Sequence, residues 1–235
     1  MSVEQFRPKK ALPPRAASEW TTMDEVRLLT CQIAADLLAG RVPALRVATT
    51  FWLPQGEVAV TNGPVRVLEL RAAGDGSYVH TSGFAFGTGA LGVALLAGSL
   101  MGNAAGNTRR RRQAEQDARL AFRHQFDASV FVTTAGFVFQ DAQGVGRWGH
   151  GDINTMQMLG PSAVAMQGDA IDRSVTWQLL TPWAELIFVA WALRQHPHHP
   201  QLVDGSWLMG EWLHYARMHG RDPRLVSTVL TPVAR

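Results

Sequence analysis

The sequence predicts an α+β protein, in which a small antiparallel β-barrel or sandwich is closed by a C-terminal helix. Two sets of short β-type runs, separated by glycine- and asparagine-containing turns, predict the strands. An apolar stretch over residues 183–193 predicts the closing helix. An uncharged, glycine-punctuated segment lies between the two sets of runs and predicts a long inserted helix.

Composition limits the class of protein before any motif is considered. The chain has 235 residues, 46% of them hydrophobic, and a formal net charge of +3. Its single cysteine, Cys31, excludes an internal disulfide framework and a thiolate metal cluster, so the cytoplasm is the expected compartment. Residues 1–18 are basic and proline-rich without an apolar core, which predicts a disordered tail rather than a secretory signal.

A helix is expected within residues 19–45. Thr21 or Thr22 is suited to cap its start, and Gly40 is suited to end it. Apolar residues recur at helical spacing between these two points, at Val26, Leu29, Ile33 and Leu37. Cys31 lies in this helix and is predicted to be an inert thiol.

The β-type runs of the two sets are expected to pair in one sheet system. The first set comprises residues 47–53, 58–60, 65–70 and 78–86, with turns predicted at Asn62-Gly63-Pro64 and Asp75-Gly76. The second set comprises residues 129–133, 137–140, 152–158, 163–167 and 174–180. A final short helix is expected within residues 207–219.

The inserted helix is expected within residues 84–125. Its first part, residues 84–105, has no charged side chain and as a helix would be about 33 Å long, enough to cross a hydrocarbon core. Small residues recur every four positions and predict a helix-packing face, formed by Ala90, Ala94, Gly98, Gly102 and Gly106. A flexible glycine-rich loop is the alternative. A single membrane span would separate the two sets of strands, so a re-entrant, surface-lying or oligomerising helix is favoured.

Four consecutive arginines follow the small-residue face, at Arg109, Arg110, Arg111 and Arg112. At a membrane surface each would attract anionic lipid by about 1 kcal/mol, so they are predicted lipid contacts. The alternative is the solvated start of a polar helix over residues 113–125. Nucleic-acid binding is not expected, because no interleaved aromatic residues accompany the arginines.

No complete catalytic, cofactor-binding or metal-binding motif is found in the sequence. Gly144 to Gly149 matches the letters G-x-G-x-x-G, but no βαβ unit surrounds it, and a turn is predicted instead. Pro197 and Pro200 interrupt helical spacing around His196, His198 and His199, so an exposed loop is predicted rather than a metal site. His150 and Asp152 lack an identifiable nucleophile or partner carboxylate. The chain is therefore predicted to be non-enzymatic.

Seven of the eight tryptophans divide into two predicted groups. Five are expected in the core, namely Trp52, Trp148, Trp177, Trp183 and Trp191. Trp207 and Trp212 are instead candidates for an interaction surface or a membrane-interface belt.

The run from Ser129 to Phe139, followed by Trp148 and Asp152-Ile153, resembles the strand-turn-strand of bacterial pleckstrin-homology-like (PH-like) and GRAM-like domains. Residues 183–193 are similar to their closing helix, so the resemblance covers residues 46–195, with 196–235 as a C-terminal extension. The chain also resembles actinobacterial proteins in which a glycine-zipper segment and an arginine run interrupt such a domain. The first turns lack the clustered Lys and Arg that bind a phosphoinositide headgroup, so specific inositide binding is not expected.

Together these patterns predict a non-catalytic module, which binds an anionic membrane surface at the inner face of the cell membrane or a protein partner. A soluble homo-oligomeric scaffold built on the small-residue face is the alternative, and a ligand-binding enzyme with a hidden site is the third hypothesis.

Overall fold

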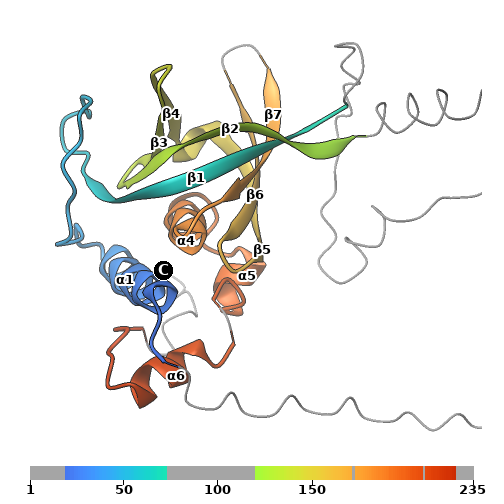
Figure 1. Cartoon of the computed structure of the whole chain (residues 1–235). Helices are drawn as coiled ribbons and strands as arrows, with labels where there is room; N and C mark the ends of the chain where they lie inside the picture. The colour runs from blue at the N-terminus through green and yellow to red at the C-terminus, as the bar shows by residue number, and fades with distance from the viewer. Residues whose placement is uncertain (1–18, 73–119, 171–172, 209, 226–235) are drawn as a thin grey trace, which may run out of the picture.

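A computed structural model describes residues 19–72, 120–170, 173–208 and 210–225. Its sheet has seven antiparallel strands, and the labelled helices lie on one side of it (Figure 1). The helices are α1 (Thr22–Leu38), the 3-10 turn η1 (His150–Asp152), α4 (Ala184–Gln195), α5 (Pro200–Val203) and α6 (Trp212–Met218). The strands are β1 (Ala59–Arg71), β2 (Ala121–Thr133), β3 (Gly136–Gln140), β4 (Val145–Gly149), β5 (Ile153–Gly160), β6 (Ala163–Asp169) and β7 (Ser174–Leu180). The predicted α+β class is confirmed.

The strand order is β4-β3-β2-β1-β7-β6-β5, so the two predicted sets of strands share one sheet through β1. β1 pairs with β2 along its whole length and with β7 over residues 66–69. β4 and β5 lie at opposite edges, and the sheet is not closed. The described strands therefore form an open sheet and not a closed barrel.

Helix α1 begins and ends as predicted. The Thr21 hydroxyl accepts the Asp24 N–H (3.2 Å), and the Asp24 carboxylate accepts the Thr21 N–H (3.0 Å), a reciprocal cap. Gly40 adopts a left-handed conformation with φ +66°, after which the Arg41 N–H returns to the Asp36 carbonyl (2.9 Å). This is the hydrogen-bond pattern of a glycine-terminated helix.

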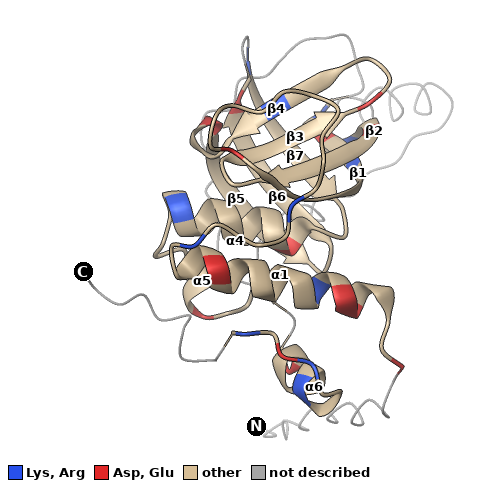
Figure 2. Cartoon of the chain, turned by 90° about the vertical axis from the view of Figure 1, so that its left-hand side faces the viewer, with Lys and Arg blue, Asp and Glu red and all other residues tan. Residues whose placement is uncertain are grey.

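Helix α4 lies between the sheet and α1, as Figure 2 shows from the side. Every residue from Ala184 to Ala192 is buried, because one face of the helix contacts strands and the other contacts α1. The apolar helix predicted after the last strand is confirmed, but it covers a face of an open sheet and does not close the end of a barrel. In the main core, the large side chains of α4, including Phe188 and Trp191, pack with inward-facing strand residues such as Val67 and Phe137.

A charged pair lies inside the α1–α4 interface. Arg27 on α1 and Glu185 on α4 approach to 3.5 Å, with 10% and 2% of their side chains exposed. Burial raises the pKa of Glu185 despite the nearby arginine. The second carboxylate oxygen of Glu185 has no hydrogen-bond partner in the described part of the chain. The interface therefore contains a buried ion pair, in which Arg27 is the cationic partner of Glu185.

The C-terminal extension folds back onto the start of α1. Trp212 on α6 donates its indole N–H to the buried carboxylate of Asp24 (2.8 Å). Trp20 stacks on Tyr215, with ring centroids 5.9 Å apart and nearly parallel planes. These contacts make α6 a third helical layer beneath α1 (Figures 1 and 2).

Three predictions of secondary structure are wrong in the described residues. Residues 47–53 form no strand; they cross the outer face of the sheet as an irregular segment. Asn62-Gly63-Pro64 is not a turn but part of β1. Residues 121–125, predicted as the end of the inserted helix, begin β2. In each case, pairing or packing with a distant segment overrides the local pattern. The turn predicted between Phe139 and Trp148 is present at residues 141–144, where it joins β3 to β4.

Candidate functional site

The segment before β1 presents an exposed tryptophan. Trp52 is 81% exposed, the most exposed large hydrophobic residue of the described chain. Its neighbours Phe51 and Leu53 pack against a small cluster on the outer face of the sheet. The Phe51 ring meets Phe131 edge-on, with centroids 5.0 Å apart. Because both neighbours are anchored, the Trp52 side chain is held away from the protein.

The same segment is tied to the β3–β4 hairpin. Gln140 donates to the Thr50 hydroxyl (2.8 Å), and Arg147 forms an ion pair with Glu57. Gln140 pairs with Val145, which is 51% exposed. The two exposed apolar residues, Trp52 and Val145, therefore lie near the same end of the hairpin. The segment that carries Trp52 is therefore fixed to the sheet by these contacts.

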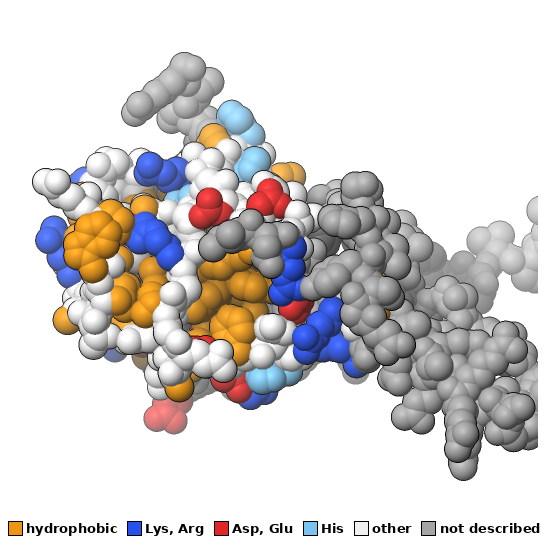
Figure 3. Space-filling view, turned by 90° about the horizontal axis from the view of Figure 1, so that it is seen from above, with side chains coloured by type: hydrophobic (Ala, Val, Ile, Leu, Met, Phe, Trp, Pro, Cys, Tyr) orange, Lys and Arg blue, Asp and Glu red, His pale blue; other side chains and the backbone are white. Residues whose placement is uncertain are grey.

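Positive charge accompanies these exposed apolar side chains. Arg46 is exposed and makes no ion pair within the described ranges, and the Arg147 side chain is 38% exposed. The carboxylate of Asp141, in the adjacent turn, accepts the backbone N–H groups of residues 143 and 144. Seen from above, hydrophobic side chains reach the surface beside arginines (Figure 3). We call Trp52, Val145, Arg46 and Arg147 the Trp52 surface.

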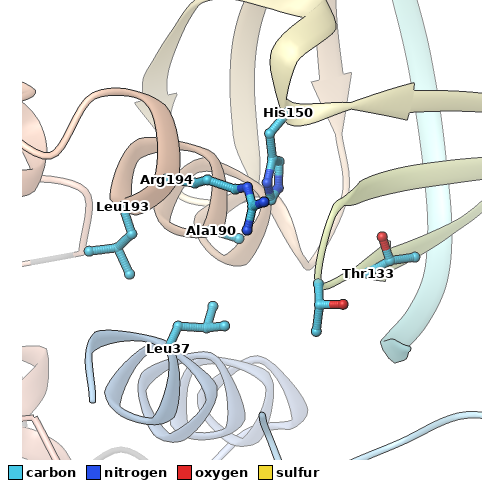
Figure 4. A pocket seen from close by; sticks show the side chains of 7 residues that line it. Leu37, Thr133, His150, Ala190, Leu193 and Arg194 are labelled. Carbon is cyan, nitrogen blue, oxygen red and sulfur yellow. The ribbon is translucent and has the colours of Figure 1, made fainter. Parts of the chain in front are cut away.

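A cavity of about 280 Å³ lies where α1, α4, η1 and the β2–β3 turn meet. It is lined by Leu37, Thr133, Thr134, His150, Ala190, Leu193 and Arg194. Figure 4 shows the His150 ring and the Arg194 guanidinium side by side, with Leu37 and Leu193 below them. One part of the wall is polar and the other aliphatic.

His150 is held in this wall as a neutral imidazole. The residue is 4% exposed, and its backbone N–H is bonded to the Ala135 carbonyl (2.9 Å). Burial, and then the charge of Arg194, lower its pKa to about 4, while Glu57 acts in the opposite direction. Its Nδ1 atom is buried and has no hydrogen-bond partner in the described structure.

The predicted packing and lipid-contact residues, Ala90 to Gly106 and Arg109 to Arg112, lie outside the described residues. The structure consequently places none of them, and the same is true of residues 78–86. Among the described helices, none combines the length and the apolar character that crossing a bilayer requires.

The candidate chemical groups have separate local partners. Asp152 accepts the Gly149 N–H (2.8 Å), so it supports the local turn, while His150 lines the cavity. His199 accepts the Gln201 N–H at the start of α5 (3.2 Å). No group of three potential metal ligands occurs within the described ranges. Burial raises the pKa of Cys31 to about 12, so its thiol stays protonated.

The tryptophan predictions are reversed at three positions. Trp207 and Trp212, predicted at a surface, are 2% and 4% exposed, whereas Trp52, predicted in the core, is exposed. Extended chains direct successive side chains to opposite sides, so packing of the partly buried Phe51 and Leu53 on the sheet directs Trp52 outward. This alternation was the available signal. No linear pattern links Arg194, His150 and Thr134, because separate elements bring them together.

In comparisons with known proteins, no family model, curated protein or solved structure matches the chain.

Proposed function

We propose that the protein is a non-catalytic module that attaches to an anionic membrane surface, at the cytoplasmic face of the cell membrane. The observation that carries this proposal is the exposure of Trp52, which is 81% exposed although its neighbours are anchored. Tryptophan partitions to the membrane–water interface, where its ring is partly buried and its N–H stays hydrated. A fixed loop loses little conformational entropy when it inserts such a side chain.

Charge supports the same partner. Arg46, which makes no ion pair in the described residues, belongs to the Trp52 surface, whereas Arg147 on the same surface is paired with Glu57. The sequence adds Arg109 to Arg112 outside the described residues. An arginine close to a membrane surface contributes about 1 kcal/mol of attraction to anionic lipid. A surface with both an interfacial aromatic residue and positive charge favours a bilayer over a neutral partner.

The scaffold of the proposed module is PH-like. An antiparallel sheet ordered β4-β3-β2-β1-β7-β6-β5, followed by a covering helix after the last strand, supports this proposal. The attachment we propose depends on general negative charge, because the sequence predicts no cluster of basic residues for one inositide headgroup. The small-residue face from Ala90 to Gly106 is proposed to pack helices in the attached or assembled state.

Co-sedimentation of the full chain with vesicles tests the attachment. Binding is expected to vesicles containing phosphatidylserine, to be weaker on phosphatidylcholine alone, and to fall at high salt. Trp52→Ala is expected to weaken binding about tenfold or more, because the interfacial ring contributes over 1 kcal/mol. Replacing Arg109 to Arg112 by glutamine is expected to weaken it further, by about fivefold per charge.

Met218→Ala provides the matched control, because Met218 is also highly exposed (73%) but lies on α6. Equal effects of Trp52→Ala and Met218→Ala, or no binding to anionic vesicles, would refute the proposal. If the protein binds no vesicle but its assembly state changes when Gly98, Gly102 and Gly106 become leucine, the homo-oligomeric scaffold is the better description.

A further inference from the structure

The cavity beside α4 contains hydrogen-bonding groups that the fold itself leaves unused. The His150 ring lines the cavity and makes no hydrogen bond in the described residues, and its Nδ1 atom is enclosed by protein, which is uncommon because most buried polar atoms are bonded. In the neutral tautomer with the proton on Nε2, the ring can donate that proton to a molecule in the cavity. The low pKa of about 4 keeps the ring neutral, so such a donor adds no charge.

Two further donors face the same space. Arg194, in the last turn of α4, is exposed and makes no ion pair in the part of the chain described. The Thr134 hydroxyl accepts the Val58 N–H (3.3 Å), which leaves its own proton for another acceptor. The Thr133 hydroxyl is already bonded to the Glu57 carboxylate. The available groups are therefore all donors, and one of them is cationic.

The charges around the cavity leave Arg194 uncompensated. Glu57 is paired with Arg147, and Asp36 near the end of α1 is paired with Arg41 (2.7 Å). His150 is neutral. The remaining single positive charge, with two neutral donors, is suited to one carboxylate, since a carboxylate accepts several hydrogen bonds and binds a guanidinium well.

The rest of the wall is aliphatic. Leu37 lines it from α1, and Ala190 and Leu193 line it from α4; Figure 4 shows Leu37 and Leu193 below the His150 ring and the Arg194 guanidinium. A volume of about 280 Å³ is at the small end of ligand pockets. The cavity thus matches a short molecule with one charged and one apolar end.

We propose that this cavity binds a small amphipathic carboxylic acid, with its carboxylate at Arg194, Thr134 and His150 and its apolar part against Leu37 and Leu193. This site is separate from the Trp52 surface, and it does not depend on membrane attachment.

Calorimetric titration of the full chain with hexanoate tests the site, with acetate and inorganic phosphate as comparison probes. Saturable binding of hexanoate is expected, with acetate weaker because it lacks the apolar part. Arg194→Gln is expected to weaken hexanoate binding about tenfold or more, since it removes a charge-assisted contact. Arg194 is exposed, so this substitution leaves the core intact.

Two substitutions at His150 distinguish a donor from a space-filling ring. His150→Phe keeps a ring but removes the donor, and is expected to weaken binding about fivefold. His150→Gln places an amide nitrogen near the position of Nε2, and is expected to retain most of the affinity. Thermal unfolding of each variant identifies any that fails to fold.

Arg46→Gln is the matched control, because it removes an exposed arginine that does not line the cavity. It is expected to leave hexanoate binding unchanged while weakening vesicle binding, whereas Arg194→Gln is expected to do the reverse. No saturable hexanoate binding, equal binding by Arg194→Gln, or phosphate competing as strongly as hexanoate would overturn the proposal.

Discussion

At the scale of single residues, Arg27 and Glu185 show how a helix interface can depend on charge. Both side chains are buried, and their closest approach of 3.5 Å is long for a strong ion pair. Desolvation of two charges is offset only partly by such a contact. The pair therefore adds little net stability, yet Glu185 has no other ion-pair partner in the described residues, whereas Arg27 also lies 3.7 Å from Asp24.

Arg27→Leu is expected to destabilise the protein by about 3–5 kcal/mol, because it leaves Glu185 as an unpaired buried carboxylate. The measurement is urea unfolding at neutral pH. The double variant Arg27→Leu, Glu185→Leu is expected to recover most of the loss, since the unpaired Glu185 carboxylate is removed and Asp24, which loses Arg27, keeps its hydrogen bonds from Trp212 and Thr21. A double variant no more stable than Arg27→Leu would contradict this account.

At the scale of elements, β1 contains a sequence that ordinarily forms a turn. Pro64 lies where β1 has β2 as its only paired neighbour, because β7 pairs from Arg66 onward, so the missing N–H is tolerated. Gly63 lies beneath Trp183, whose indole N–H donates to the Asn62 carbonyl (2.8 Å). The start of the closing helix is thus seated directly on the backbone of β1.

Gly63→Ala is expected to destabilise the fold by about 1–3 kcal/mol, the range for overpacking a well-packed site. A Cβ atom there would lie 2.7 Å from Nε1 of Trp183, so the ring must move and its hydrogen bond must lengthen. Thermal unfolding measures the change. Gly146→Ala, on β4, serves as control because no atom lies within 4 Å of the position that its Cβ would take, and it is expected to have a much smaller effect. Equal losses in both variants would argue against the Trp183 contact.

At the scale of the whole molecule, the buried His150 links folding to pH. Its folded pKa of about 4 is below the ordinary value of 6.5, so the neutral ring stabilises the folded state above pH 6.5. This contribution is lost as the pH falls from 6.5 toward 4, because the unfolded chain binds the proton first.

The wild-type protein is therefore expected to lose about 2–3 kcal/mol more unfolding free energy than His150→Asn between pH 7.5 and 4.5. The measurement is the difference between the two proteins in denaturant unfolding at each pH. Comparison with the variant cancels the opposing effect of Glu185, whose raised pKa favours folding at lower pH. Parallel losses in the two proteins would show that His150 does not titrate across folding.

The sequence by itself determined the class of fold and most of its elements. Thr21 and Gly40 act locally, through a side chain and a backbone conformation, so α1 was predictable at both ends. Helix α4 was predictable because an apolar helix must be buried on all sides. β7 was predicted with the same bounds that it has in the structure, from a run of residues that favour extended chain.

Only the tertiary structure decided which of these residues are exposed and which meet. Trp52 is exposed and Trp212 is buried because of the neighbours that other segments supply, and no local pattern specifies those neighbours. The cavity likewise joins Leu37, His150 and Arg194 across more than half of the chain. Side-chain pattern determines local conformation within a few residues, whereas a binding site depends on distances that only the packed elements set.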